Sequence, residues 1–125
     1  MADKVTWFEL PAFDVDRAGK FYKEVFGWEG SDMGGGSLAM VSAESDEQMT
    51  PLKPGSINGD ISPISIGFSS PLIVISVEDM DKKIDMVRQA GGLVILEPKK
   101  VEEMGMIWAI VQDTEGNKVG IIQSL

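Results

Sequence analysis

The chain carries the same local sequence plan twice. Residues 5–28 predict a strand, a helix that begins after an aspartate, and an exit at glycine, and this plan returns 65 residues later. The positions that correspond in type are Trp7 with Leu72, Asp14 with Asp79, Phe21 with Met86, Val25 with Ala90, and Gly27 with Gly92. A repeated strand–helix unit predicts two half-folds related by an internal pseudo-twofold. The seam between such halves is where we expect a cavity and any function.

The length of 125 residues predicts a single domain, 1–125, with modules at about 1–62 and 71–125. A hydrophobic share of 43% and a charged share of 25% are ordinary for a globular protein. No apolar run approaches the roughly 20 residues that a membrane span needs. The N-terminus lacks the pattern of a secretory signal and the chain has no cysteine, so we expect a cytoplasmic protein without disulfides.

The net charge of −9 argues against two classes of partner. It repels the phosphates of nucleic acids and anionic membrane surfaces, so we expect neither as a partner. The chain has no histidine. It therefore lacks the usual general base at neutral pH and the commonest neutral metal ligand.

Hydrophobic periodicity predicts two βαβββ modules. Apolar residues at helical spacing follow Asp14 and Asp79, each of which is placed to cap a helix N-terminus. The four hydrophobic residues Phe21, Tyr22, Val25 and Phe26 are expected in the core. Glycines 34–36 and residues 113–117 predict turns, and 44–70 predicts a loop with at most one short strand near 58–62. The other expected strands are 5–10, 28–33, 38–43, 72–77, 93–97, 107–111 and 119–123.

These motifs resemble the vicinal oxygen chelate superfamily of glyoxalase I, bleomycin resistance proteins and extradiol dioxygenases. The matching segments are Trp7-Phe-Glu-Leu-Pro11, Asp14-x-x-Arg17-Ala18-x-x-Phe21-Tyr22-x-x-Val25-Phe26-Gly27-Trp28, Val77-Glu-Asp79 and Asp113-Thr-Glu-Gly-Asn117. The resemblance covers nearly the whole chain. It implies an α+β fold in which two tandem βαβββ modules form a cup-shaped half-barrel with the helices outside, and it implies a homodimer.

At the positions where this superfamily holds its metal, the chain has other residue types. The resemblance places Trp7, Leu72 and Gly120 at three ligand positions, and none of these side chains can bind a divalent ion. The fourth position falls in the irregular stretch near Asn58–Ile61, where Asp60 would be a lone ligand. We therefore expect no metal and no cofactor. Glyoxalase I and extradiol dioxygenase activities are not expected, because both need a Lewis acid.

The proposed ligand site lies in the cup. Trp7 and Glu9 alternate with Phe8 and Leu10 along the first strand, so they share the face that points away from the helix. Glu9 either pairs with Lys118 across the seam as a structural ion pair, or recognises a polar group of a ligand. No residue is assigned a catalytic role, although Glu9 is the candidate for a general base. The expected ligand-binding residues are Trp7, Glu9, Met40, Asp60, Leu72, Val74, Trp108 and Lys118.

The favoured function is binding of a small organic molecule by a metal-free, homodimeric member of this fold. One alternative is a metal-independent lyase or isomerase that uses a carboxylate of the cavity. Another is an antibiotic-sequestering protein similar to bleomycin resistance proteins.

Overall fold

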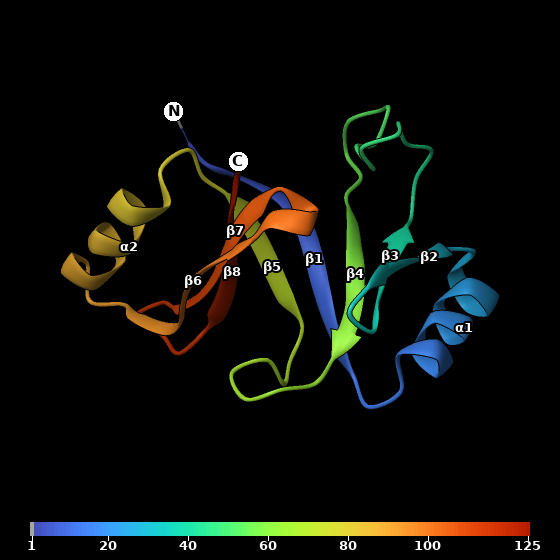
Figure 1. The fold of residues 1–125 in the computed structure, drawn as a ribbon, viewed down its shortest axis with the longest axis horizontal. Coiled ribbons are helices and arrows are strands. Elements are labelled where there is room, and N and C mark those ends of the chain that lie inside the picture. Colours follow the sequence, from blue (N-terminus) through green and yellow to red (C-terminus); the bar gives the residue numbers. More distant parts are fainter. Residues whose placement is uncertain (1) are drawn as a thin grey trace. The chain divides into compact units, whose positions relative to one another are not determined.

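The computed structural model describes residues 2–125, which fall into two compact units. The N-terminal unit is Trp7–Pro71, and the C-terminal unit consists of the residues up to Thr6 together with Leu72–Leu125. Each unit contains one helix and one open sheet of strands (Figure 1). Among the described residues, no helix is both long enough and apolar enough to cross a bilayer.

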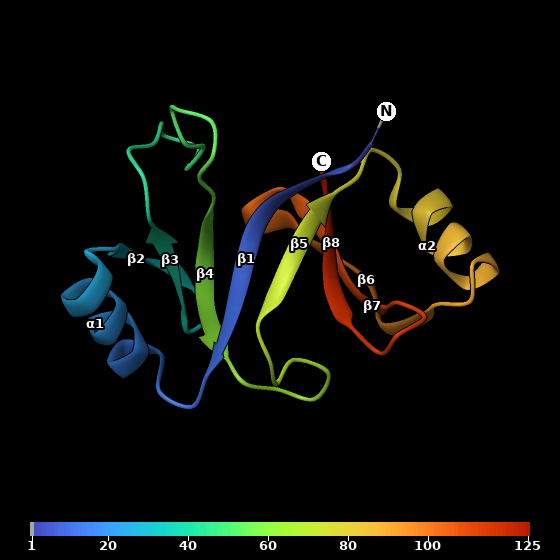
Figure 2. The same ribbon diagram turned by 180° about the vertical axis from the view of Figure 1, so that it is seen from behind.

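The N-terminal unit has the predicted βαβββ order. Its sheet has the strand order β2-β3-β4-β1, in which β1 pairs with β4 in parallel and the other neighbours are antiparallel. Helix α1 lies beside this sheet in both views (Figures 1 and 2). The elements are β1 (Lys4–Ala12), α1 (Val15–Phe26), β2 (Glu29–Gly34), β3 (Ser37–Val41) and β4 (Asn58–Pro63).

The C-terminal unit repeats this topology. Its strand order is β5-β8-β7-β6, with β5 parallel to β8 and the other pairs antiparallel. In both units, therefore, the first strand of the module pairs in parallel with the last. The elements are β5 (Leu72–Ser76), α2 (Met80–Gln89), β6 (Leu93–Val101), a 3-10 turn η1 (Glu102–Met104), β7 (Met106–Gln112) and β8 (Lys118–Ser124). The predicted α+β class and the two βαβββ modules are confirmed.

The two helices begin in the same way. Asp14 has φ −134° and ψ 102° and accepts a hydrogen bond from the backbone N–H of Arg17. Asp79 has φ −135° and ψ 99° and accepts from the N–H of Lys82. Each aspartate thus satisfies one N–H group that the first helical turn leaves free.

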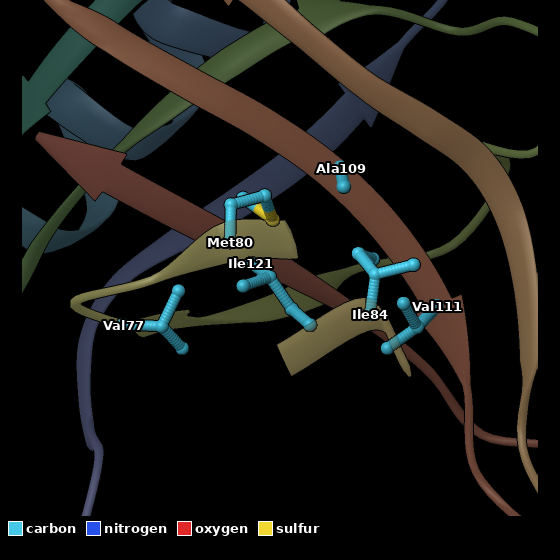
Figure 3. Packing of buried hydrophobic residues seen from close by; sticks show 6 residues of the cluster. All are labelled: Val77, Met80, Ile84, Ala109, Val111 and Ile121. Carbon is cyan, nitrogen blue, oxygen red and sulfur yellow. The ribbon is translucent and has the colours of Figure 1, made fainter. Parts of the chain in front are cut away.

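Each helix packs on one face of its own sheet. Under α1, the buried residues Ala12, Met40 and Ile61 form a cluster. Under α2, the cluster consists of Val77, Met80, Ile84, Ala109, Val111 and Ile121 (Figure 3).

The expectation that all four hydrophobic residues of α1 lie in the core is wrong. Phe21, Val25 and Phe26 are 53%, 56% and 58% exposed, and only Tyr22 packs against the cluster. The reason is that α1 turns Val15, Ala18 and Tyr22 to the sheet. The other three side chains lie on the part of the helix surface beyond that stripe.

The predicted turns are present, whereas strand β6 extends furthest beyond its predicted end. Gly34, Gly35 and Gly36 all have positive φ between β2 and β3. Asp113 accepts hydrogen bonds from the N–H groups of Glu115 and Asn117 in the turn between β7 and β8. Strand β6 continues to Val101, past the predicted end at residue 97, with a register shift between Leu96 and Lys99. A proline and two lysines in this part hide the strand pattern.

Side chains at the start of β1 and just before it contact the C-terminal unit. The hydroxyl groups of Thr6 and Ser76 lie 2.6 Å apart, and Lys83 of α2 forms an ion pair of 2.8 Å with Asp3. The boundary between the units therefore falls within β1, whereas the module boundaries expected from sequence fall in the loop between the two halves.

Candidate functional site: a buried carboxyl pair beside Trp7

Strand β1 presents two chemically different faces. Phe8 and Leu10 pack into the cluster under α1, as the alternation predicts. Trp7 and Glu9 therefore point to the opposite face of the sheet. The parallel pairing of β1 with β4 places Glu9 directly beside Asp60 and Trp7 beside Asn58. The sheet thus brings two acidic side chains together on one face.

Trp7, Glu9 and Asp60 form a hydrogen-bonded group, which we call the Trp7–Glu9–Asp60 cluster. The indole Nε1–H of Trp7 donates to Oδ2 of Asp60 at 2.7 Å. The Ser62 hydroxyl donates to Oδ1 of Asp60, also at 2.7 Å, and Glu9 hydrogen bonds to the same carboxyl. A hydrogen bond between two carboxyl groups requires a proton on one of them.

Burial controls the acidity of this pair. Glu9 is 8% exposed and Asp60 is 6% exposed, whereas Trp7 is only half-buried. Burial raises the pKa of Asp60, because the charged form loses its hydration. Hydrogen bonds from Trp7, Ser62 and Glu9 oppose this rise in pKa without cancelling it. Burial therefore favours the neutral form of Asp60 more than water favours that of an exposed aspartate.

The polar residues next to the cluster hold the surrounding backbone. Ser37 and Ser62 hydrogen bond through their hydroxyl groups at 2.8 Å. Asn58, which is fully buried, accepts from the N–H of Ser42 and donates to the hydroxyl of Ser45 and the carbonyl of Met49. Asn58 thereby ties β4 to the loop that precedes it. The sequence gives no signal for this role, because these partners lie nine to sixteen residues away along the loop.

Of the other predicted residues of the N-terminal unit, Met40 lies on the wrong face. It is fully buried with Ala12 and Ile61 in the cluster under α1. Its neighbour Ala39 pairs with Asp60 and so shares the face of the carboxyl pair. The structure therefore places Met40 in the core and not with Trp7, because the register of β3 turns its side chain toward the helix.

The remaining predicted residues lie in the C-terminal unit, on the sheet face opposite α2. Ile75 and Ile121 pack toward α2, so their neighbours Val74 and Leu72 point the other way. Leu72 and Val74 are both buried, at 2% and 1% exposed. Trp108 pairs with Ile122, next to Ile121, and is half-buried, as is Lys118 at the start of β8. The pairing of Lys118 with Glu9 remains a prediction.

The residues at the expected metal positions have the structural surroundings of ordinary strand residues. Leu72 is buried, Gly120 pairs with Val74, and the indole N–H of Trp7 is committed to Asp60. Across residues 2–125, no three His, Cys, Asp or Glu side chains come together in a group that could hold a metal ion.

Comparison with known sequences gives a family match and several relatives. A family model described as bleomycin resistance protein-like N-terminal matches residues 4–43. A Mycobacterium tuberculosis protein named as a glyoxylase, CFP32, is 31% identical over 94% of this chain. The chain spans only 44% of that relative. A glyoxylase-like domain-containing protein of Didymella fabae is 29% identical over 91% of this chain and 88% of its own length.

Solved structures with low identity share the fold. A glyoxalase/bleomycin resistance protein/dioxygenase superfamily member from Vibrio splendidus has a TM-score of 0.65 at 15% identity, covering 98% of this chain and 100% of its own. A methylmalonyl-CoA epimerase of Streptomyces coelicolor, solved with 2-nitronate-propionyl-CoA, has a TM-score of 0.66 at 15% identity. That alignment covers 99% of this chain and 96% of the epimerase.

Proposed function

The chain belongs to the vicinal oxygen chelate superfamily, and from that premise we propose that it binds a small organic molecule without a metal ion. The binding surface is the sheet face of the N-terminal unit that carries the Trp7–Glu9–Asp60 cluster. Trp7 stacks on a flat part of the ligand, and the carboxyl pair binds its polar group.

The buried carboxyl pair is the observation that carries this proposal. Two acidic side chains, each less than a tenth exposed, lie side by side on a sheet face that does not pack against α1. Placing carboxyl groups out of water costs free energy, which apolar residues at these positions would avoid. A ligand that makes a further hydrogen bond to the pair adds a favourable contact to those that the protein already provides. The arrangement is therefore suited to recognition.

The carboxyl oxygens of the pair define the chemistry of the ligand. A hydrogen-bonded pair of carboxyl groups offers acceptor oxygens. It therefore suits an amine, an amide N–H or a hydroxyl group better than a carboxylate or phosphate. Trp7, whose N–H is held by Asp60, offers its ring for stacking on a flat ligand. Leu72, Val74, Trp108 and Lys118 remain predictions from the sequence, and Met40 is left out.

Proton transfer at the same pair is the second candidate function. The direction of the Asp60 shift favours it, because burial raises the pKa of this carboxyl above that of an exposed aspartate and so moves it toward the range in which a general acid or base works. The fold is also that of a methylmalonyl-CoA epimerase. In this alternative, Glu9 and Asp60 move a proton on a bound substrate in a lyase or isomerase reaction that needs no metal.

Sequestration of an antibiotic is the third candidate. The match of residues 4–43 to a bleomycin resistance protein-like model supports it. It shares the binding surface of the main proposal and requires no turnover, so a preference for cationic antibiotics separates it from general ligand binding.

The experiment screens flat amines and amides against the wild type in EDTA by thermal shift and tryptophan fluorescence. Trp7→Ala is expected to weaken binding of a hit roughly tenfold or more, since loss of the indole removes about 1–3 kcal/mol of apolar burial and stacking. Phe13→Ala, which removes an 87% exposed aromatic ring of the same unit, is the matched control and should bind as the wild type does. The proposal fails if no compound binds, or if Trp7→Ala retains every affinity.

A further inference from the structure

The C-terminal unit contains a cavity on the side of its sheet that α2 covers. Its volume is about 410 Å³, within the range of small-molecule sites in proteins. Most of its wall is apolar. The larger apolar lining residues are Ile75, Val77, Val87, Val111, Val119 and Ile121.

The way in which α2 packs explains the cavity. Met80 and Ile84 anchor the helix on the sheet, where they are 1% and 4% exposed (Figure 3). Lys83, Val87 and Ala90 follow at helical spacing along the next stripe of the same helix and line the cavity. This second stripe packs less closely on the sheet than Met80 and Ile84 do. Its alanine and valine side chains are too short to fill the space between α2 and the sheet.

The rim of the cavity is charged. Lys83 and Asp3 form their ion pair of 2.8 Å there, and each side chain is only 31% exposed. Asp113 is the third charged residue of the lining. Its carboxylate accepts two backbone N–H bonds and the side-chain amide of Asn117, which lower its pKa and keep it ionised. Since Asp3 and Lys83 neutralise each other, the rim carries one net negative charge.

We propose that this cavity is a second binding site, which takes a small apolar amine. The apolar body of the amine lies between α2 and the sheet, against Val87, Val111 and Ile121. Its ammonium group lies at the rim, near the carboxylate of Asp113. The net charge of −9 on the whole chain further favours cations near its surface.

Three probes of nearly equal shape test the charge preference: naphthylmethylamine, naphthalenemethanol and naphthoate. In calorimetric titrations of Trp7→Ala, which removes the first proposed site, the amine should bind about two- to fivefold more tightly than the alcohol at neutral pH, as expected of an exposed ion pair. The carboxylate should bind most weakly. Equal affinity for the amine and the carboxylate would overturn the proposed ligand class.

Variants of α2 test the location. In a Trp7→Ala background, which removes the first proposed site, Val87→Trp fills the cavity and should abolish binding of naphthylmethylamine, and Ala90→Leu should weaken it with a smaller change of volume. Met86→Trp places the same indole on the exposed side of α2, where Met86 is 47% exposed, and should bind as the wild type does. Circular dichroism checks that each variant is folded. A folded Val87→Trp protein that retains the wild-type affinity would contradict the assignment.

Amide resonances of the wild-type protein provide a test that needs no variant. Addition of naphthylmethylamine should shift the signals of residues 83–90 and 111–114 in a saturable manner. The absence of such shifts at millimolar probe would overturn the proposal. Failure here is distinguishable from failure of the proposed function, because Trp7→Ala should leave these shifts unchanged.

Discussion

At the scale of single residues, the surroundings of Asp60 couple its protonation to the stability of the fold. Its carboxyl is 6% exposed, and burial raises its pKa above the value of 3.8 that it has in an unfolded chain. Between these two pKa values, the folded protein binds more protons at this group than the unfolded protein does. This group therefore stabilises the fold less as the pH rises through the interval, in contrast to the usual surface carboxylate.

Asp60→Asn removes this titration while preserving the shape of the side chain. The free energy of unfolding of the wild type exceeds or falls short of that of Asp60→Asn by an amount that depends on pH. This difference, wild type minus variant, should fall as the pH rises above 3.8. The limit for one proton is about 1.4 kcal/mol per pH unit. Urea unfolding of both proteins from mildly acidic to neutral pH measures this difference. A difference that is flat or rises with pH would contradict the account.

The side chains of this cluster illustrate what sequence can predict at this scale. The alternation along β1 correctly places Phe8 and Leu10 toward α1 and thereby puts Trp7 and Glu9 on the other face. The partnership with Asp60 could not be predicted, because it depends on the register of a parallel strand pair 53 residues apart. The exposed Phe21 and Phe26 show where prediction of burial from sequence fails. Helical spacing alone does not say how wide the buried stripe of a helix is.

At the scale of secondary structure elements, the repeat is closest at the starts of the two helices. The capping residues Asp14 and Asp79 have nearly the same backbone angles. Each side chain also accepts a hydrogen bond from the backbone N–H three residues further along the chain. The ends of the helices differ. Gly27 takes a left-handed conformation with φ 74° after α1, whereas Ala90 with φ −86° follows α2 and the positive φ falls on Gly91. The sequence match of Gly27 with Gly92 is therefore not a match of conformation.

The equal geometry of the caps predicts equal energetic effects. Asp14→Ala and Asp79→Ala should each lower the free energy of unfolding by about 0.5–2 kcal/mol. Because asparagine also caps well, Asp14→Asn and Asp79→Asn should retain most of the stability. Chemical denaturation of the four variants measures the effects. A loss at only one helix, or an equal loss for alanine and asparagine, would show that the capping bonds are not equivalent.

At the scale of the whole molecule, the two units end in edge strands. Strand β2 ends the order of the N-terminal sheet, and β6 ends that of the C-terminal sheet. Exposed strand edges are available for pairing with another chain. Together with the homodimer that the family resemblance implies, this supports the proposal of a dimer with a twofold axis, in which both chains use the same surface.

Light scattering at micromolar concentration tests the dimer. The expected mass is twice the 13.6 kDa of one chain. A mass of 13.6 kDa across the concentration range would contradict the proposal.

The Trp7–Glu9–Asp60 cluster is proposed to bind an organic ligand without a metal ion. The indole N–H of Trp7 reports on it directly, because this proton is donated to Asp60. Its resonance is assigned by its absence from Trp7→Phe, and small amines, amides and alcohols are then titrated into the wild type in EDTA. The account predicts a saturable shift of this resonance with at least one ligand. It is contradicted if no ligand shifts the resonance, or if a shift occurs only after a divalent metal is added.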